Sequence, residues 1–156
     1  MSKKVFLFAG IILSLFLAYT MTISNIYSWY MASAMVSDIP NYNYKPTGAQ
    51  IAELIFGIIG AIPLIVSLVN FVKDYKEDKC WDKAFTIAAL GTGILIFGYL
   101  LMNGIGLHES IQGLNAEQYK GALIGSYLLS FINPFVTIIL FGLAYTANKQ
   151  EAKVEQ

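Results

Sequence analysis

The stretch IAELIFGIIGAIPLIVSLVNFV, residues 51–72, decides the fold, because Glu53 is its only charged residue. Roughly 20 helical residues, at a rise of about 1.5 Å each, cross a hydrocarbon core about 30 Å thick. Three more stretches are equally apolar and hold no charged residue, namely residues 5–24, 84–106 and 121–147. The sequence therefore predicts an all-α integral membrane protein, a bundle of four transmembrane helices.

The composition of the chain agrees with this class. Hydrophobic residues make up 56% of the 156 residues and charged residues only 13%, whereas an average soluble domain has roughly 25% charged residues. Ten lysines balance ten acidic residues, so no excess positive charge favours a nucleic-acid partner. We expect one membrane domain over residues 1–156, in contact with the lipid bilayer.

The placement of the lysines predicts the topology. Only Lys45 and Lys120, of the ten basic residues, fall on one side of the predicted membrane. The positive-inside rule therefore predicts that both termini, the 73–83 loop and the 148–156 tail are cytoplasmic. We expect a prokaryotic plasma membrane, with outer segments at residues 25–50 and 107–120. The lysines on the predicted cytoplasmic side are Lys3, Lys4, Lys73, Lys76, Lys79, Lys83, Lys149 and Lys153.

The first apolar run has a second interpretation. A basic start followed by VFLFAGIILSLFLA is typical of a secretory signal, and residues 32–34 offer an A-x-A pattern. This pattern lies well beyond the end of the apolar run, so we expect the first span to be retained. Cleavage would leave three spans. The residues after Ser24 could also continue the first helix into the headgroup region.

The two predicted outer segments differ in character. Residues 25–50 are rich in tyrosine and tryptophan, which anchor chains at membrane interfaces because their rings have an apolar body and a polar tip. A lid or a partner-docking surface is the alternative interpretation. In the second segment, Asn115 and Gln118 resemble a capping box, so span four is expected to begin near Ala116. The expected interface anchors are Tyr27, Trp29, Tyr30, Tyr42 and Tyr44.

Small residues four positions apart recur in three of the spans. Such pairs let helix backbones approach closely, which is a main route to helix association in lipid. The spacing predicts close packing within the chain or between chains. The pairs are Gly57 with Ala61, Ala89 with Gly93, and Gly121 with Gly125.

Two prolines are expected to kink the second and fourth spans. Pro63 and Pro134 each lack the N–H that would bond the carbonyl four residues earlier, and such carbonyls can coordinate ions where they line a cavity. A polar site for an ion is one hypothesis, and polar groups that bond across the bundle are the alternative. The residues concerned are Glu53, Ser67, Thr92, Asn133 and Thr137.

Catalytic and metal-binding patterns are weak. His108 with Glu109, Glu117 and Asp38 could supply metal ligands, but no known ligand spacing supports a site. No histidine lies in a span to hold a haem, and Cys80 is the only cysteine. The chain contains no G-x-S-x-G or Walker motif. We therefore expect no metal, no cofactor and no enzymatic activity.

The function that fits these patterns best is an accessory or structural subunit of a larger membrane protein complex. Its partners would be other membrane subunits, or copies of itself, bound by helix packing. The alternative is a small oligomeric channel or transporter that uses Glu53 and the polar residues near the proline kinks. A third class, an immunity or stress-response protein that shields the membrane, has no residue pattern that tests it.

Overall fold

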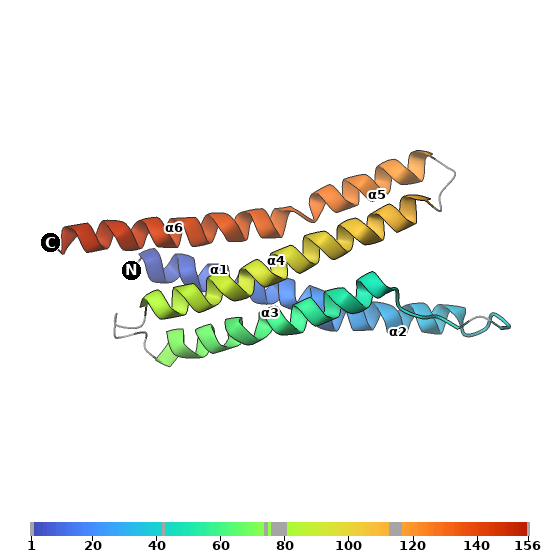
Figure 1. Ribbon diagram of the computed structural model, residues 1–156, viewed down its shortest axis with the longest axis horizontal. Helices are drawn as coiled ribbons and strands as arrows, with labels where there is room; N and C mark the ends of the chain where they lie inside the picture. The colour runs from blue at the N-terminus through green and yellow to red at the C-terminus, as the bar shows by residue number, and fades with distance from the viewer. Residues whose placement is uncertain (1, 42, 74, 76–80, 113–116, 156) are drawn as a thin grey trace.

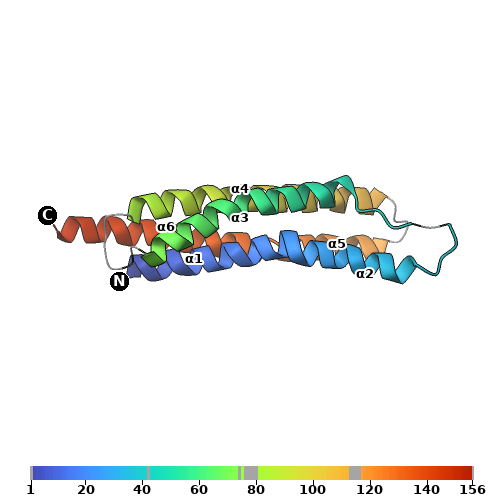
Figure 2. The ribbon, with the colours of Figure 1, turned by 90° about the horizontal axis from the view of Figure 1, so that it is seen from below.

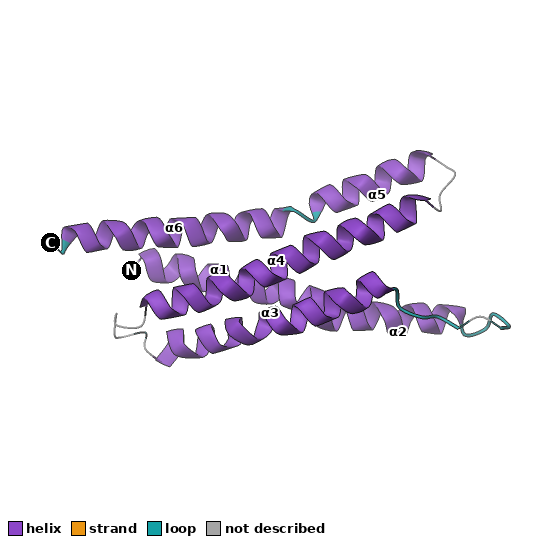
Figure 3. Ribbon diagram, in the orientation of Figure 1, coloured by secondary structure: helices purple, strands orange, loops and turns teal. Residues whose placement is uncertain are grey.

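A computed structural model describes residues 2–41, 43–73, 75, 81–112 and 117–155. Over these ranges the chain forms helices joined by loops and turns, without a strand (Figure 3). The elements are α1 (Ser2–Tyr19), the π-helix η1 (Thr20–Ser24), α2 (Asn25–Val36), α3 (Gly48–Lys73), α4 (Trp81–Gln112), α5 (Glu117–Leu129) and α6 (Ile132–Val154).

These elements make four rods that lie side by side (Figures 1 and 2). The first rod is α1–η1–α2, the second α3, the third α4 and the fourth α5–α6. All four are long and apolar enough to cross a membrane, over Lys3–Val36, Gly48–Lys73, Lys83–Gln112 and Lys120–Val154. The predicted four-helix bundle is therefore confirmed. Both termini lie at one end of the bundle, the terminal end, and the 37–47 loop lies at the opposite, distal end.

The rods extend further than the apolar runs alone indicate. Residues 25–36, assigned above to an outer segment, are the helix α2, which continues the first rod through η1. Similarly, α4 has 32 residues, which at about 1.5 Å each make a helix of about 48 Å. Because the hydrocarbon core is only about 30 Å thick, parts of the rods project into the headgroup region or beyond.

The two prolines affect their helices differently. Pro63 lies inside α3, which continues through it to Lys73. In the fourth rod, by contrast, the helix is interrupted at residues 130–131, just before Pro134, and the rod bends there (Figure 1). Since Pro134 has no N–H for the Ser130 carbonyl, the chain turns tightly instead: the Ser130 N–H lies 3.0 Å from the Tyr127 carbonyl oxygen.

The helices α3 and α4 form an antiparallel hairpin with very close backbones. A Cβ atom added at Gly91 would lie 2.8 Å from the carbonyl oxygen of Gly60, and one added at Gly98 would lie 2.4 Å from Phe56 Cβ. Apart from Thr92, which contacts Ser14 of α1, the buried positions of α4 alternate by four and three residues, as in coiled-coil seams. They are Ala84, Ala88, Gly91, Leu95 and Gly98.

The predicted small-residue pairs are divided between packed and open positions. Gly57 faces η1, since a Cβ there would lie 2.9 Å from Met21 Cβ. Ala61 and Ala89 are partly buried against the core. Gly93, Gly121 and Gly125 lie at open positions: a Cβ at any of them would meet no described atom within 4 Å, so for these three the predicted close packing could only be with another chain.

The helix α1 packs against α3, α4 and α6. At its middle, the buried Ser14 hydroxyl lies 2.8 Å from the Thr92 hydroxyl of α4 and donates to the Gly10 carbonyl. Because the single Ser14 proton is used in that bond, the Thr92 hydroxyl is the donor to Ser14. One position earlier, the Asn133 amide of α6 donates to the Leu13 carbonyl, at 3.3 Å. Polar groups thus join three rods at mid-bundle.

Substitutions at this pair should have unequal effects. Ser14→Ala leaves the buried Thr92 hydroxyl without its acceptor and should lower the free energy of unfolding by about 1 kcal/mol. Thr92→Val removes the donor and keeps the shape, so it should cost less. In the Thr92→Val background, Ser14→Ala should lose most of its effect. Unfolding in a detergent-denaturant titration measures all three values, and additive effects would show that the two hydroxyls do not interact.

Candidate functional site

A polar cavity of about 810 Å³ lies at the distal end, and we call it the distal vestibule. The first rod, α3, α4 and α5 all contribute to its wall. Hydroxyl side chains predominate in the parts of the wall that come from the first rod and from α5 with the turn after it. Glu53 and Glu109 are the acidic residues of the described wall. The polar and aromatic side chains of the wall are Thr20, Ser24, Asn25, Ser28, Thr47, Gln50, Glu53, Tyr99, Asn103, Glu109, Ser110, Ser126, Tyr127 and Ser130.

Glu53 lies just over one turn from the start of α3 and is half-buried. The Asn103 amide nitrogen is 3.5 Å from Glu53 Oε1, whereas it lies only 2.7 Å from the Tyr99 carbonyl oxygen. The stronger bond of this amide therefore goes to backbone, and the carboxylate is held weakly. No lysine among the described residues forms an ion pair with Glu53.

A capping box at the start of α3 fixes two residues of the vestibule wall, Thr47 and Gln50. The Gln50 N–H donates to the Thr47 hydroxyl at 3.3 Å, and the Thr47 N–H donates to the Gln50 side chain at 2.9 Å. The Asn25 amide donates to the Gln50 carbonyl at 2.9 Å, which ties α2 to α3. This box is not among the sequence predictions above, although the T-x-x-Q pattern from Thr47 to Gln50 is typical of one. The expected box at Asn115 lies outside the described residues.

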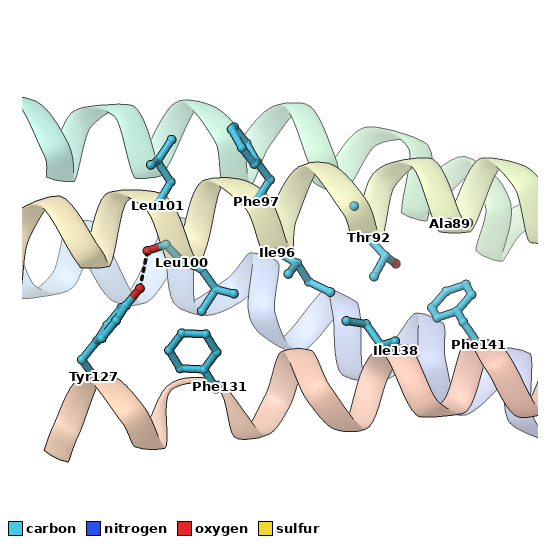
Figure 4. A pocket seen from close by; sticks show the side chains of 11 residues that line it. Ala89, Thr92, Ile96, Phe97, Leu100, Leu101, Tyr127, Phe131, Ile138 and Phe141 are labelled. Atoms are coloured by element: carbon cyan, nitrogen blue, oxygen red, sulfur yellow. Dashed lines mark hydrogen bonds between the residues drawn. The ribbon is translucent and has the colours of Figure 1, made fainter. Parts of the chain in front are cut away.

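A second cavity, of about 670 Å³, is an apolar groove between α4 and the fourth rod (Figure 4). It exists because α6 packs mainly on α1, while α5 packs on α4, so α4 and α6 diverge. Tyr127 lines both cavities, and its hydroxyl donates to the Leu100 carbonyl at 3.1 Å. The groove is lined by Ala89, Thr92, Gly93, Ile96, Phe97, Leu100, Leu101, Tyr127, Phe131, Ile138 and Phe141.

The polar residues expected to form one ion pathway lie in three places. Glu53 is in the distal vestibule. At mid-bundle the Thr92 hydroxyl is hydrogen-bonded to Ser14 of α1. In the same region, Thr137 of α6 donates to the Asn133 side chain. Ser67 donates to the Ala84 carbonyl near the terminal end. The described residues thus place these groups in separate contacts, within or between helices, and do not gather them around one cavity.

The expected interface anchors occupy different surroundings. Tyr27 and Tyr30 are exposed on α2, with 61% and 68% of their surface accessible. The Trp29 indole N–H is buried and has no hydrogen-bond partner among the described residues. Tyr44 donates to the Gln50 side chain at 3.2 Å, and Tyr42 lies outside the described residues.

The candidate metal ligands are dispersed. His108 is exposed and lies 3.0 Å from the Gln112 amide, one turn along α4. Glu109 is exposed at the vestibule, and Asp38 is exposed in the 37–47 loop. The Glu117 side chain and Cys80 lie outside what the structure describes. Within the described part of the chain, no three His, Cys, Asp or Glu side chains gather as a metal site.

Comparison with protein-family models, curated proteins and solved structures finds no match to this chain. The fold and the two cavities described above therefore indicate the general class of protein and no particular family. It is a small integral membrane protein built as a bundle of four long apolar helices, with a polar vestibule at one end and an apolar groove along one side.

Proposed function

We propose that this protein is an accessory subunit of a larger membrane complex, and that a transmembrane helix of the partner packs into the groove between α4 and α6. The observation that supports this most directly is the wall of the groove. Ala89 and Gly93 lie four residues apart on α4 and both line it, and no atom of the described residues lies within 4 Å of a Cβ added at Gly93.

The dimensions of the groove suit a helix. Its α4 wall runs from Ala89 to Leu101, which at about 1.5 Å per residue is about 18 Å, over half of a hydrocarbon core. The Thr92 hydroxyl is already bonded to Ser14, so the surface offered to a partner is apolar. Helix association in lipid depends on close van der Waals packing, which small residues permit.

The remaining elements of the proposal follow from the sequence. Lysine placement supports an orientation with both termini in the cytoplasm, which would put the vestibule on the outer side. The chain itself would supply no catalytic group, metal or cofactor. Its contribution to the complex would be structural.

Filling the groove should release the partner. We expect Gly93→Leu to reduce stoichiometric association by about tenfold, because the new side chain occupies the space for the partner backbone. Gly142→Leu is the matched control, since Gly142 also has nothing within 4 Å but lies outside the groove. Complexes purified in mild detergent would be analysed by mass.

Three results would contradict the proposal. One is a wild-type chain that purifies without a stoichiometric partner. Another is a homo-oligomer that conducts ions in liposomes, which would favour a channel. The third is an unchanged complex with Gly93→Leu in a protein that folds normally.

A further inference from the structure

We propose that the distal vestibule binds a small organic ammonium ion, with the Glu53 carboxylate as its counter-ion. This site is distinct from the apolar groove, because Tyr127 is the only described residue that lines both cavities. The inference therefore does not depend on the proposed partner helix.

The first argument is the charge of Glu53. An ionisable group within a membrane span is costly unless it pairs or serves a function. The described residues give Glu53 one long contact, to the Asn103 amide at 3.5 Å, and no ion pair. Among its described residues, the wall of the vestibule contains Glu109 as a second acid and no lysine or histidine. A bound cation would supply the missing opposite charge.

The second argument is the direction in which the hydroxyl groups of the wall donate their hydrogen bonds. Thr20 donates to the Phe16 carbonyl at 3.1 Å, Ser28 to the Ser24 carbonyl at 3.1 Å, and Ser110 to the Gly106 carbonyl at 2.8 Å. Each hydroxyl has one proton, which is used in these bonds, so what remains is acceptor lone pairs. Ser130 behaves in the same way, donating to the Tyr127 carbonyl. The vestibule is therefore rich in acceptors, which match a group that only donates.

The third argument separates an organic cation from a metal ion. A volume of about 810 Å³ falls in the usual range of small-molecule sites, about 300–1,000 Å³. A metal such as calcium needs several oxygens that converge within about 2.6 Å, and no cluster of acidic and histidine residues is present in the described chain. Tyr99, Tyr127 and Met102 also line the cavity. Aromatic faces attract ammonium groups, and apolar side chains accommodate a hydrocarbon body.

The test is a binding titration on the full chain in lipid nanodiscs, with phenylethylammonium and butylammonium as probes. We expect both to bind saturably. Phenylethanol and phenylpropionate, the neutral and anionic counterparts, should bind about tenfold more weakly or not at all, because they lack the positive charge.

The deciding variant is Glu53→Gln, which preserves shape and removes the charge. Ammonium affinity should fall by about tenfold or more. Asp38→Asn, which removes an exposed charge in the 37–47 loop outside the vestibule wall, should change it by less than about threefold, because solvent screens that carboxylate. Helicity and melting temperature measured alongside would show that both variants fold.

Several outcomes would overturn the proposal. They are failure of both ammonium probes to bind the wild-type chain, equal binding of the neutral counterpart, and full retention of affinity in a folded Glu53→Gln variant. Displacement of the probes by sodium or potassium at equal concentration would instead assign the vestibule to inorganic cations. None of these results bears on the groove, where the Gly93→Leu test would stand unaffected.

Discussion

Gly91→Ala is expected to lower the free energy of unfolding by about 2–3 kcal/mol. The same substitution two residues along α4, Gly93→Ala, should leave stability unchanged or raise it by up to about 1 kcal/mol. The two variants add one methyl group to the same helix, so any difference between them reflects their surroundings.

The reason lies in the contact between α3 and α4. The added methyl group at Gly91 would meet the Gly60 carbonyl oxygen at 2.8 Å, and also Pro63 Cβ and Leu64 Cγ, both at 3.1 Å. The closest of these atoms belongs to the backbone, so relief requires the two helices to move apart. At Gly93 the methyl group would meet nothing within 4 Å, and alanine has the higher helix propensity.

A titration of the detergent-solubilised chain with a denaturing detergent, followed by circular dichroism, measures both values. Gly60→Ala provides an independent check from the opposite helix, since its methyl group would lie 2.5 Å from Leu95 Cγ. Equal stability of Gly91→Ala and Gly93→Ala would show that α3 and α4 are not in this register.

The contrast between Gly91 and Gly93 also shows how far the sequence alone could lead. Four apolar runs predict four spans, because the length and polarity of a span depend on the chain itself. Which face of a span packs depends on its neighbours. The spacing of four identified Ala89 and Gly93, but the seam with α3 alternates by three and four residues and includes Gly91 and Gly98. A motif search cannot choose between two faces that both hold small residues.

The vestibule was less predictable than the spans. Glu53 could be singled out, since it is the only charged residue in an apolar run. The residues of the wall around Glu53 are brought together by two features of the three-dimensional structure. The helix α2 extends the first rod past the apolar run, and the interruption at residues 130–131 separates α5 from α6. Thr20 and Ser130 are ordinary polar residues in the sequence, and only the fold places them in one cavity.

The second large effect on stability is expected at Phe141 of α6, which lines the groove. Phe141 is 8% exposed, and its ring lies 5.7 Å from that of Phe85, edge to face. On the other side, the ring reaches the space above Gly10, where an added Cβ would lie 3.0 Å from its edge. One side chain thus links α6 to α1 and α4, so Phe141→Ala should loosen the attachment of the fourth rod.

We expect Phe141→Ala to cost about 2 kcal/mol. Truncating a buried phenylalanine costs about 3–5 kcal/mol in water-soluble cores, but the loss is smaller where lipid removes the hydrophobic contribution and only packing remains. The matched control is Phe135→Ala on the same helix, where the ring is 65% exposed and should be dispensable. A reversal of sign gives the sharper test: Gly10→Val should destabilise the wild-type chain by crowding Phe141, yet stabilise the Phe141→Ala variant by filling its cavity. If Gly10→Val has the same effect in both backgrounds, Phe141 does not occupy the space beside Gly10, and α6 is held to α1 by other contacts.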